Sequence, residues 1–152
     1  MSMLSKIHAL LVKAGRILQS PVLLVIRLYW GWQFFIDGKG KLQNLDKVAA
    51  YFATLNLPMP RANAIAVAST QCVFGLLLLG GLFTRFAALV LAGVMSVAYL
   101  TAEKEALHAI FSDSDKFVSA APFLFLFASA IAFCFGPGIF SLDALVFRGR
   151  KT

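Results

Sequence analysis

The sequence has few charged residues for its length. Only 14% of its 152 residues are Asp, Glu, Lys or Arg, whereas 60% are hydrophobic, and the mean hydropathy is +0.82. A soluble domain carries about 25% charged and about 45–50% apolar residues. So little polar surface cannot cover a water-facing globule. This excludes most soluble enzyme classes and intrinsic disorder, and it predicts a membrane protein.

Cysteine and histidine are also scarce, with two of each. Cys72 and Cys134 fall in different apolar segments and form no C-x-x-C motif, which argues against a disulfide scaffold and against paired-thiol chemistry. His8 and His108 fall on opposite sides of the membrane in the topology given below, and no cluster has metal-ligand spacing. We therefore expect no metal site and no intrinsic cofactor. The sequence also has no glycine-rich phosphate loop and no nucleophile elbow.

What the sequence does contain is four long apolar stretches. A helix needs about 20 apolar residues to cross a hydrocarbon core about 30 Å thick. The expected spans are residues 21–36, 62–83, 86–102 and 117–141, and the first contains the single charged residue among them, Arg27. Ser20 and Pro21 offer an N-cap and a first-turn proline for that span. The sequence predicts an all-α, integral membrane four-helix bundle over residues 20–145.

Two segments outside the spans have helical periodicity. In residues 1–19, apolar side chains recur every three or four positions opposite basic ones. This pattern predicts an N-terminal amphipathic helix on the inner leaflet, or else a plain basic lead-in to the first span. Between the first two spans, an apolar stripe from Leu45 to Leu55 predicts a short interfacial helix. That helix either dips into the outer interface or forms a lid on the bundle.

The net charge of +7 is interpreted as topology rather than as a nucleic-acid footprint. Four spans place both termini on one side, where seven basic residues stand against one acid, Asp143. The opposite side mixes basic and acidic residues. Basic residues concentrate in cytoplasmic loops. We therefore expect a multi-pass protein of the cytoplasmic (inner) membrane with both termini, including a basic tail at 146–152, in the cytoplasm.

Arg27 is the most informative candidate for a functional side chain. A charge inside a span either faces the protein interior with a partner or snorkels to the headgroups. Helical spacing puts Arg27, Trp30, Gly31 and Phe34 on one face, with Asp37 at its outer edge. Gln71, an amide in the second span, either ties two helices together through Arg27 or Asp37 or contacts a ligand.

Three motifs occur in order along the chain. The first runs from Arg27-Leu28 through Gly31, Phe34-Phe35 and Gly38 to Lys41-Leu42. The second contains Gly75, Gly80 and Arg85 at the expected hairpin. The third is Gly136-Pro137-Gly138 followed by Ser141-Leu142-Asp143. Physically, the third motif ends the fourth span, Ser141 caps the next turn, and Asp143 either starts that turn or pairs with Arg85.

Together these motifs resemble the DoxX family of small four-helix bacterial membrane proteins. The resemblance covers Val22 to Leu145. It implies either a subunit of a quinone-linked oxidoreductase or an anchor for redox enzymes. On the first hypothesis, a quinone headgroup lies near Arg27, Trp30, Trp32 and Gln33. The alternative is a non-catalytic scaffold, carrier or lipid-binding module. In both cases we expect a binding or subunit role, with a redox partner protein or a homo-oligomer, rather than a stand-alone enzyme.

Overall fold

The computed structural model describes residues 3–147, and within that range it contains helices and no β-strand. The predicted all-α membrane bundle is therefore confirmed. The basic tail at 146–152 lies almost entirely outside the described residues. The helices, in chain order, are α1 (Met3–Gln43), α2 (Leu45–Thr54), α3 (Pro60–Gly80), α4 (Thr84–Thr101), α5 (Lys104–His108), α6 (Ser114–Ser119), α7 (Pro122–Phe135) and α8 (Leu142–Phe147).

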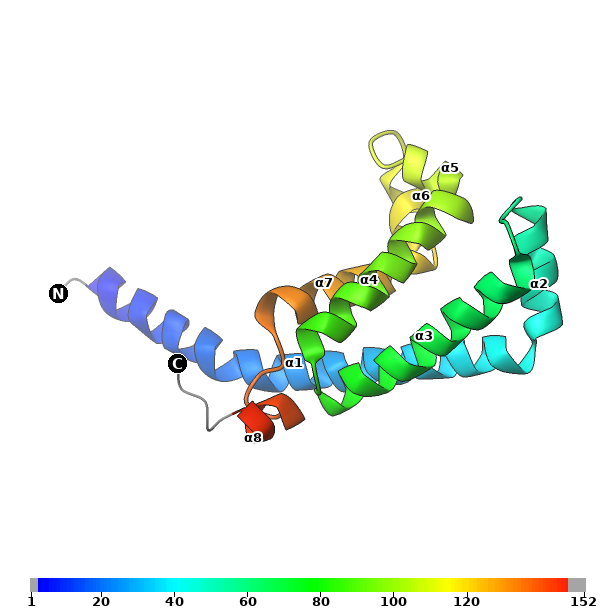
Figure 1. The fold of residues 1–152 in the computed structure, drawn as a ribbon. Coiled ribbons are helices and arrows are strands. Elements are labelled where there is room, and N and C mark those ends of the chain that lie inside the picture. Colours follow the sequence, from blue (N-terminus) through cyan, green and yellow to red (C-terminus); the bar gives the residue numbers. More distant parts are fainter. Residues whose placement is uncertain (1–2, 148–152) are drawn as a thin grey trace.

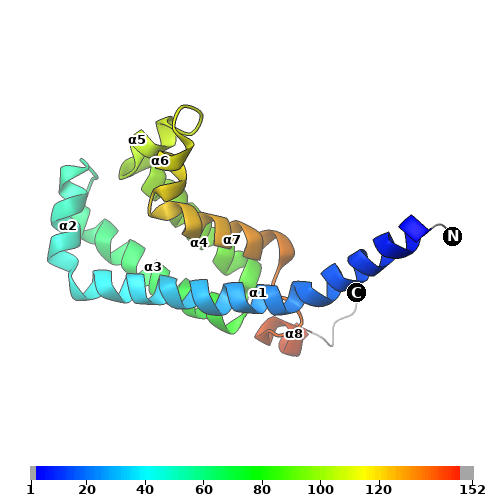
Figure 2. The same ribbon diagram turned by 180° about the vertical axis from the view of Figure 1, so that it is seen from behind.

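The predicted start of a helix at Ser20 and Pro21 is wrong. α1 is one helix of 41 residues that passes through Pro21. Its first part projects past the other helices and is bent relative to the rest (Figure 2). A proline inside a helix removes one backbone hydrogen bond and kinks the chain without necessarily ending it. The amphipathic segment and the first span are thus one continuous element.

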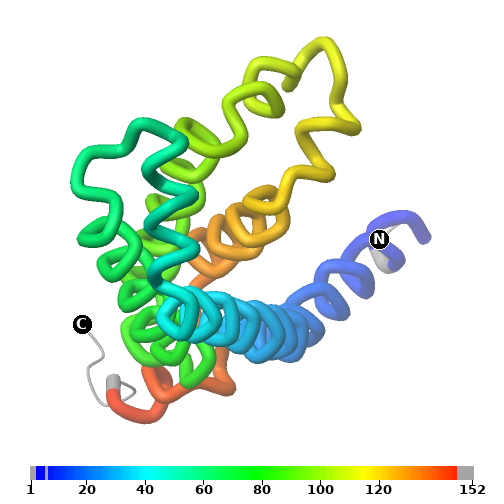
Figure 3. The backbone as a smooth tube through the Cα atoms, turned by 90° about the vertical axis from the view of Figure 1, so that its right-hand side faces the viewer, coloured from blue at the N-terminus to red at the C-terminus, as the bar shows by residue number. Residues whose placement is uncertain are grey.

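The helices that follow α1 form two pairs. α3 runs back beside α1, while α4 leaves the turn at Gly81–Phe83 and rises beside α7 toward α5 and α6 (Figure 1). The predicted tight turn between the second and third spans is confirmed, but α3 and α4 diverge beyond it. We call the region of this turn, α8 and residues 136–141 the hairpin end. The region of α2, α5 and α6 is called the open end (Figure 3).

α1 and α3 pack closely because small residues line their contact. A Cβ atom built on Gly31 would lie 2.6 Å from the backbone nitrogen of Leu79. One built on Gly75 would lie 2.8 Å from the backbone nitrogen of Phe35. Real Cβ atoms do not approach backbone so closely, so only glycine fits at these positions. Small residues at such crossings are a common feature of helix packing in membranes.

The fourth apolar segment differs from its predicted boundaries of 117–141. It is divided into α6 and α7, and α7 has 14 residues. At about 1.5 Å per residue α7 is about 21 Å long, less than the hydrocarbon core of about 30 Å. In the described part of the chain, three helices are long and apolar enough to cross a membrane, namely α1, α3 and α4, while α7 is a shorter apolar helix.

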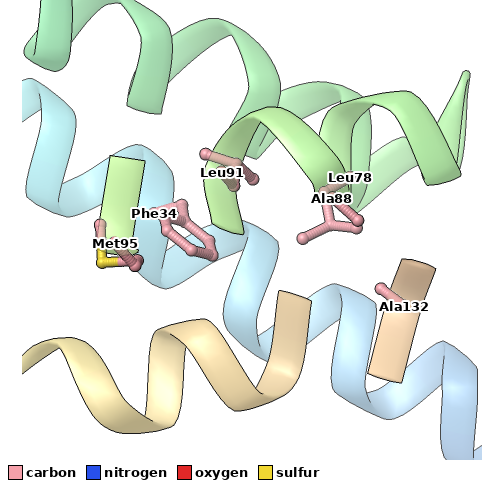
Figure 4. Close-up of a cluster of buried hydrophobic side chains, with 6 residues drawn as sticks. All are labelled: Phe34, Leu78, Ala88, Leu91, Met95 and Ala132. Carbon is pink, nitrogen blue, oxygen red and sulfur yellow. The ribbon is translucent and has the colours of Figure 1, made fainter. Parts of the chain in front are cut away.

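A small hydrophobic core lies where the two pairs meet. It consists of Phe34, Leu78, Ala88, Leu91, Met95 and Ala132 (Figure 4). The Phe34 ring is fully buried and meets the ring of Phe125 of α7 edge-on, at 4.7 Å between centroids. The apolar residues on the outer faces of the helices remain exposed, as expected for a surface that contacts lipid.

At the open end, short polar contacts connect the elements beyond α4. The Tyr99 hydroxyl donates a hydrogen bond of 2.9 Å to the carbonyl oxygen of Phe117, and the two rings stack. Lys116 of α6 bonds Glu105 of α5 at 2.9 Å, and this contact lowers the pKa of the Glu105 carboxyl. These contacts hold α5 and α6 over the end of the α4–α7 pair.

Candidate functional site

Arg27 lies buried at the hairpin end, with 2% of its surface exposed. Its Nε donates to the carbonyl oxygen of Leu78 at 3.3 Å, and its Nη2 donates to that of Phe140 at 3.1 Å. Its Nη1 donates to the carbonyl oxygen of Pro137. Of the two alternatives for Arg27, burial is therefore correct and snorkelling is wrong. The guanidinium thus binds one carbonyl at the end of α3, which also accepts from Gly81 N–H at 3.1 Å, and two carbonyls of the loop after α7.

Gly81 makes room for this guanidinium. Its φ of +69° is a left-handed conformation that glycine adopts without strain. A Cβ atom at this position would lie 2.6 Å from the Cζ atom of Arg27 and 2.8 Å from the Cβ atom of Ser141. The glycine thus ends α3 and allows the turn to lie directly against the Arg27 side chain.

The closing motif ends α7 as the sequence predicts, but Asp143 has a different partner. α7 stops at Phe135, directly before Gly136, and the Ser141 hydroxyl accepts a bond of 3.0 Å from Ala144 N–H. The Asp143 carboxylate accepts bonds of 2.7 and 2.9 Å from the backbone N–H groups of Phe83 and Thr84. Asp143 thus caps α4, because the first N–H groups of a helix lack intrahelical acceptors.

The suggested pair between Asp143 and Arg85 is therefore wrong. No ion pair joins these two residues, both of which lie in the described part of the chain. The guanidinium of Arg85 lies beside Gly136 instead, where a Cβ atom would come within 3.2 Å of its Nε.

A second polar cluster lies toward the open end and consists of Asp37 and Lys41 of α1 and Gln71 of α3. Lys41 Nζ forms an ion pair with Asp37 and donates to Gln71 Oε1 at 2.7 Å. Gln71 Nε2 donates to Asp37 Oδ2 at 2.8 Å. Gln71 thus ties α1 to α3 through Asp37, one of the two partners that the sequence offers. Gly38 permits this approach, because a Cβ there would lie 2.7 Å from the carbonyl oxygen of Ala68.

The Asp37–Lys41–Gln71 cluster lines a cavity of about 360 Å³ between the two helix pairs. Its walls are mainly apolar and include Val67, Val94, Met95, Ala98 and Phe125. Tyr51 and Phe52 of α2 border it, so the short helix after the first span covers a site as well as the bundle. An apolar pocket of about 300–1,000 Å³ with a few convergent polar groups is the usual form of a small-molecule site.

The structure separates the candidate ligand-binding residues that the sequence suggests into two groups. Asp37 and Gln71 line the cavity, whereas Arg27, Trp30, Trp32 and Gln33 do not. Trp30 packs edge-on against Phe125, at 5.0 Å between ring centroids, and Trp32 is half exposed on the outside of α1. Arg27 and Asp37 are ten positions apart, which is about 15 Å along a helix. One side chain therefore cannot assist the other at a common headgroup.

Lys41 is the cavity residue that sequence reasoning missed. It belongs to the first sequence motif, but it lies just beyond the expected span. From the sequence alone, its charge therefore serves only to predict the topology. The available signal is its spacing of four from Asp37, which places an acid and a base on one helix face. The helix boundary hides this signal, because α1 continues to Gln43 rather than ending near residue 36.

Three comparisons with known proteins bear on the family to which the chain belongs. The family model DoxX matches residues 22–104, more than half of the chain. Over 129 residues the chain is 29% identical to a Bacillus subtilis protein named "Putative oxidoreductase CatD", with 85% of this chain and 90% of that protein covered. It is 27% identical over 134 residues to an uncharacterised Haemophilus influenzae protein, with 86% of each covered. No solved structure matches the chain.

Proposed function

Because this chain belongs to the DoxX family, and because a relative similar along most of its length is named as an oxidoreductase, we propose that it is a redox-associated membrane subunit that binds the headgroup of a quinone. The observation that carries the proposal is the cavity of about 360 Å³ beside Asp37, Lys41 and Gln71. The protein works in the inner membrane with both termini in the cytoplasm.

The cavity suits the chemistry of a quinone headgroup. Such a headgroup is a flat ring with two carbonyl oxygens, and its apolar tail keeps it in lipid. An ammonium group has three N–H donors, and Lys41 uses two on Asp37 and Gln71. The third is free for a ligand carbonyl. Met95, Ala98 and Phe125 offer apolar contacts for the ring.

The bound quinone and the residues that line the cavity have different roles. A bound quinone supplies two-electron chemistry coupled to protons. This chain's own residues bind and orient the headgroup: Lys41 donates to an oxygen, Asp37 holds the Lys41 ammonium, and Gln71 fixes the Asp37 carboxylate. Electrons reach the site from a partner protein, with this chain as the membrane subunit. Arg27 has no part in binding, because its guanidinium is engaged with backbone carbonyls at the hairpin end.

The test is equilibrium binding of decylubiquinone to the full chain in lipid nanodiscs, compared with empty nanodiscs. Lys41→Met removes the proposed donor, and we expect the Kd to rise about tenfold to a hundredfold. A hydrogen bond from a charged group contributes about 1.5–3 kcal/mol, and about 1.4 kcal/mol is tenfold in affinity. The matched control is Lys39→Met, because Lys39 is exposed on the same helix and does not line the cavity.

Equal Kd values for wild type and Lys41→Met would exclude Lys41 as the donor. Absence of decylubiquinone binding by wild type would contradict the quinone proposal itself. The role of a non-catalytic anchor would then be the better interpretation of the bundle.

A further inference from the structure

The charges around the cavity restrict the kind of headgroup that it accepts. Its lining includes one basic residue, Lys41, and two acidic residues, Asp37 and Glu103. Lys41 is already paired with Asp37. In the described part of the chain, no ion pair involves Glu103. The lining therefore carries a formal excess of one negative charge.

We infer that the cavity selects an uncharged, hydrogen-bond-accepting headgroup on an apolar chain and rejects anionic headgroups of the same size. The inference rests on the proposed function in that it places the ligand in the same cavity. It goes further by assigning selectivity to the Asp37–Lys41 pair. Asp37 cancels the charge of Lys41 while leaving it one N–H donor. That donor accommodates a ketone or quinone oxygen, whereas a carboxylate, phosphate or similar anion meets an ammonium whose charge Asp37 already cancels.

Gln71 makes this compensation a fixed feature of the site. It is fully buried, accepts from Lys41 and donates to Asp37. A buried amide with both ends engaged holds the acid and the base in one arrangement. The Asp37 carboxylate therefore stays beside the ammonium and is not free to withdraw when an anion arrives.

Arg27, the buried cation of the described part of the chain, offers an anion no alternative site within the bundle. Arg27 is buried, but its guanidinium donates to three backbone carbonyls and does not line the cavity. The charge of a headgroup is therefore discriminated at the polar end of the cavity, by Asp37 and Lys41.

The experiment compares two ten-carbon amphiphiles, decan-2-one and decanoate, by direct binding to the full chain in nanodiscs of neutral lipid. For wild type we expect decan-2-one to bind at least about tenfold more tightly than decanoate, because the carboxylate is brought close to the Asp37 carboxylate and like charges in contact disfavour binding. Asp37→Asn keeps the shape of the side chain but leaves Lys41 uncompensated, so we expect it to reverse the preference. Glu103→Gln is the matched control and should change the ratio less than about threefold, because Glu103 has no contact with Lys41.

A wild-type protein that binds decanoate as tightly as decan-2-one would overturn the inference, as would a wild-type protein that binds neither. An equal effect of Glu103→Gln and Asp37→Asn would also overturn it, because selectivity would then come from the general field rather than from the pair. Binding of decan-2-one without binding of decylubiquinone would contradict the quinone proposal and leave this inference standing. If Asp37→Asn fails to fold, Lys41→Met replaces it. It should weaken the binding of decan-2-one about tenfold or more without tightening that of decanoate, and unchanged binding of decan-2-one would overturn the inference.

Discussion

At the scale of single residues, the Arg27–Gly81 contact makes a sharp prediction about stability. Gly81→Ala introduces a Cβ atom 2.6 Å from Arg27 Cζ at a φ of +69°. We expect it to lower the free energy of unfolding by about 2–4 kcal/mol, because steric overpacking and a left-handed non-glycine residue each cost about 1–3 kcal/mol. Unfolding by SDS in mixed micelles, followed by circular dichroism, measures the change.

Gly93→Ala is the matched control, because a Cβ atom at Gly93 meets nothing within 4 Å. Alanine is the better helix former by about 1 kcal/mol, so this variant should be neutral or slightly more stable than wild type. Similar losses in the two variants would show that the Arg27 contact is not what makes Gly81 necessary.

Arg27 also shows what sequence alone can and cannot establish about a residue. A charge inside an apolar span requires a partner, and this rule predicts its burial. The rule does not identify the partner. Leu78, Pro137 and Phe140 contribute backbone carbonyls, and every residue has the same backbone carbonyl whatever its side chain. Side-chain patterns therefore suggested a ligand site at Arg27. In the structure, Arg27 instead donates hydrogen bonds to three backbone carbonyls, an arrangement that we call the Arg27 clasp.

At the scale of helices, Asp143 makes α8 the cap of α4. Asp143→Ala leaves the N–H groups of Phe83 and Thr84 without their acceptor. We expect a loss of about 0.5–2 kcal/mol in the free energy of unfolding, as measured for other N-caps. Arg85→Gln distinguishes this role from a salt bridge with Arg85. It should change stability by less than Asp143→Ala does, and an equal loss in the same SDS titration would favour an Asp143–Arg85 interaction instead.

The helix boundaries show where sequence patterns fail and why. Apolar length predicts the ends of α3 and α4 to within three residues, because the turn between them is marked by glycines and by Arg85. It misplaces the start of α1, since Ser20-Pro21 fits a helix start as well as a kink. It also fuses α6, α7 and the loop at 136–141 into one span, because hydropathy does not distinguish apolar helix from apolar loop.

At the scale of the whole molecule, the short α7 and the Arg27 clasp are parts of one arrangement. α7 is about 21 Å long and must be extended by residues 136–141 if the chain is to cross the membrane. A non-helical segment at membrane depth is tolerated only where its backbone groups have partners inside the protein. Arg27 supplies donors to two carbonyls of this segment, those of Pro137 and Phe140. We therefore predict that this contact with Arg27 lets the chain complete a fourth crossing with a short helix.

Four crossings would place both chain ends on one side of the membrane, and the distribution of basic residues predicts that this side is the cytoplasm. The test introduces single cysteines into a chain lacking Cys72 and Cys134. In spheroplasts, a membrane-impermeant maleimide should label Ser112→Cys, in the α5–α6 connection, without lysis. It should label Leu4→Cys and Val146→Cys, at positions 79% and 63% exposed, only after lysis. Labelling of Leu4→Cys alone before lysis would mean an odd number of crossings, and the clasped segment would then not complete a span.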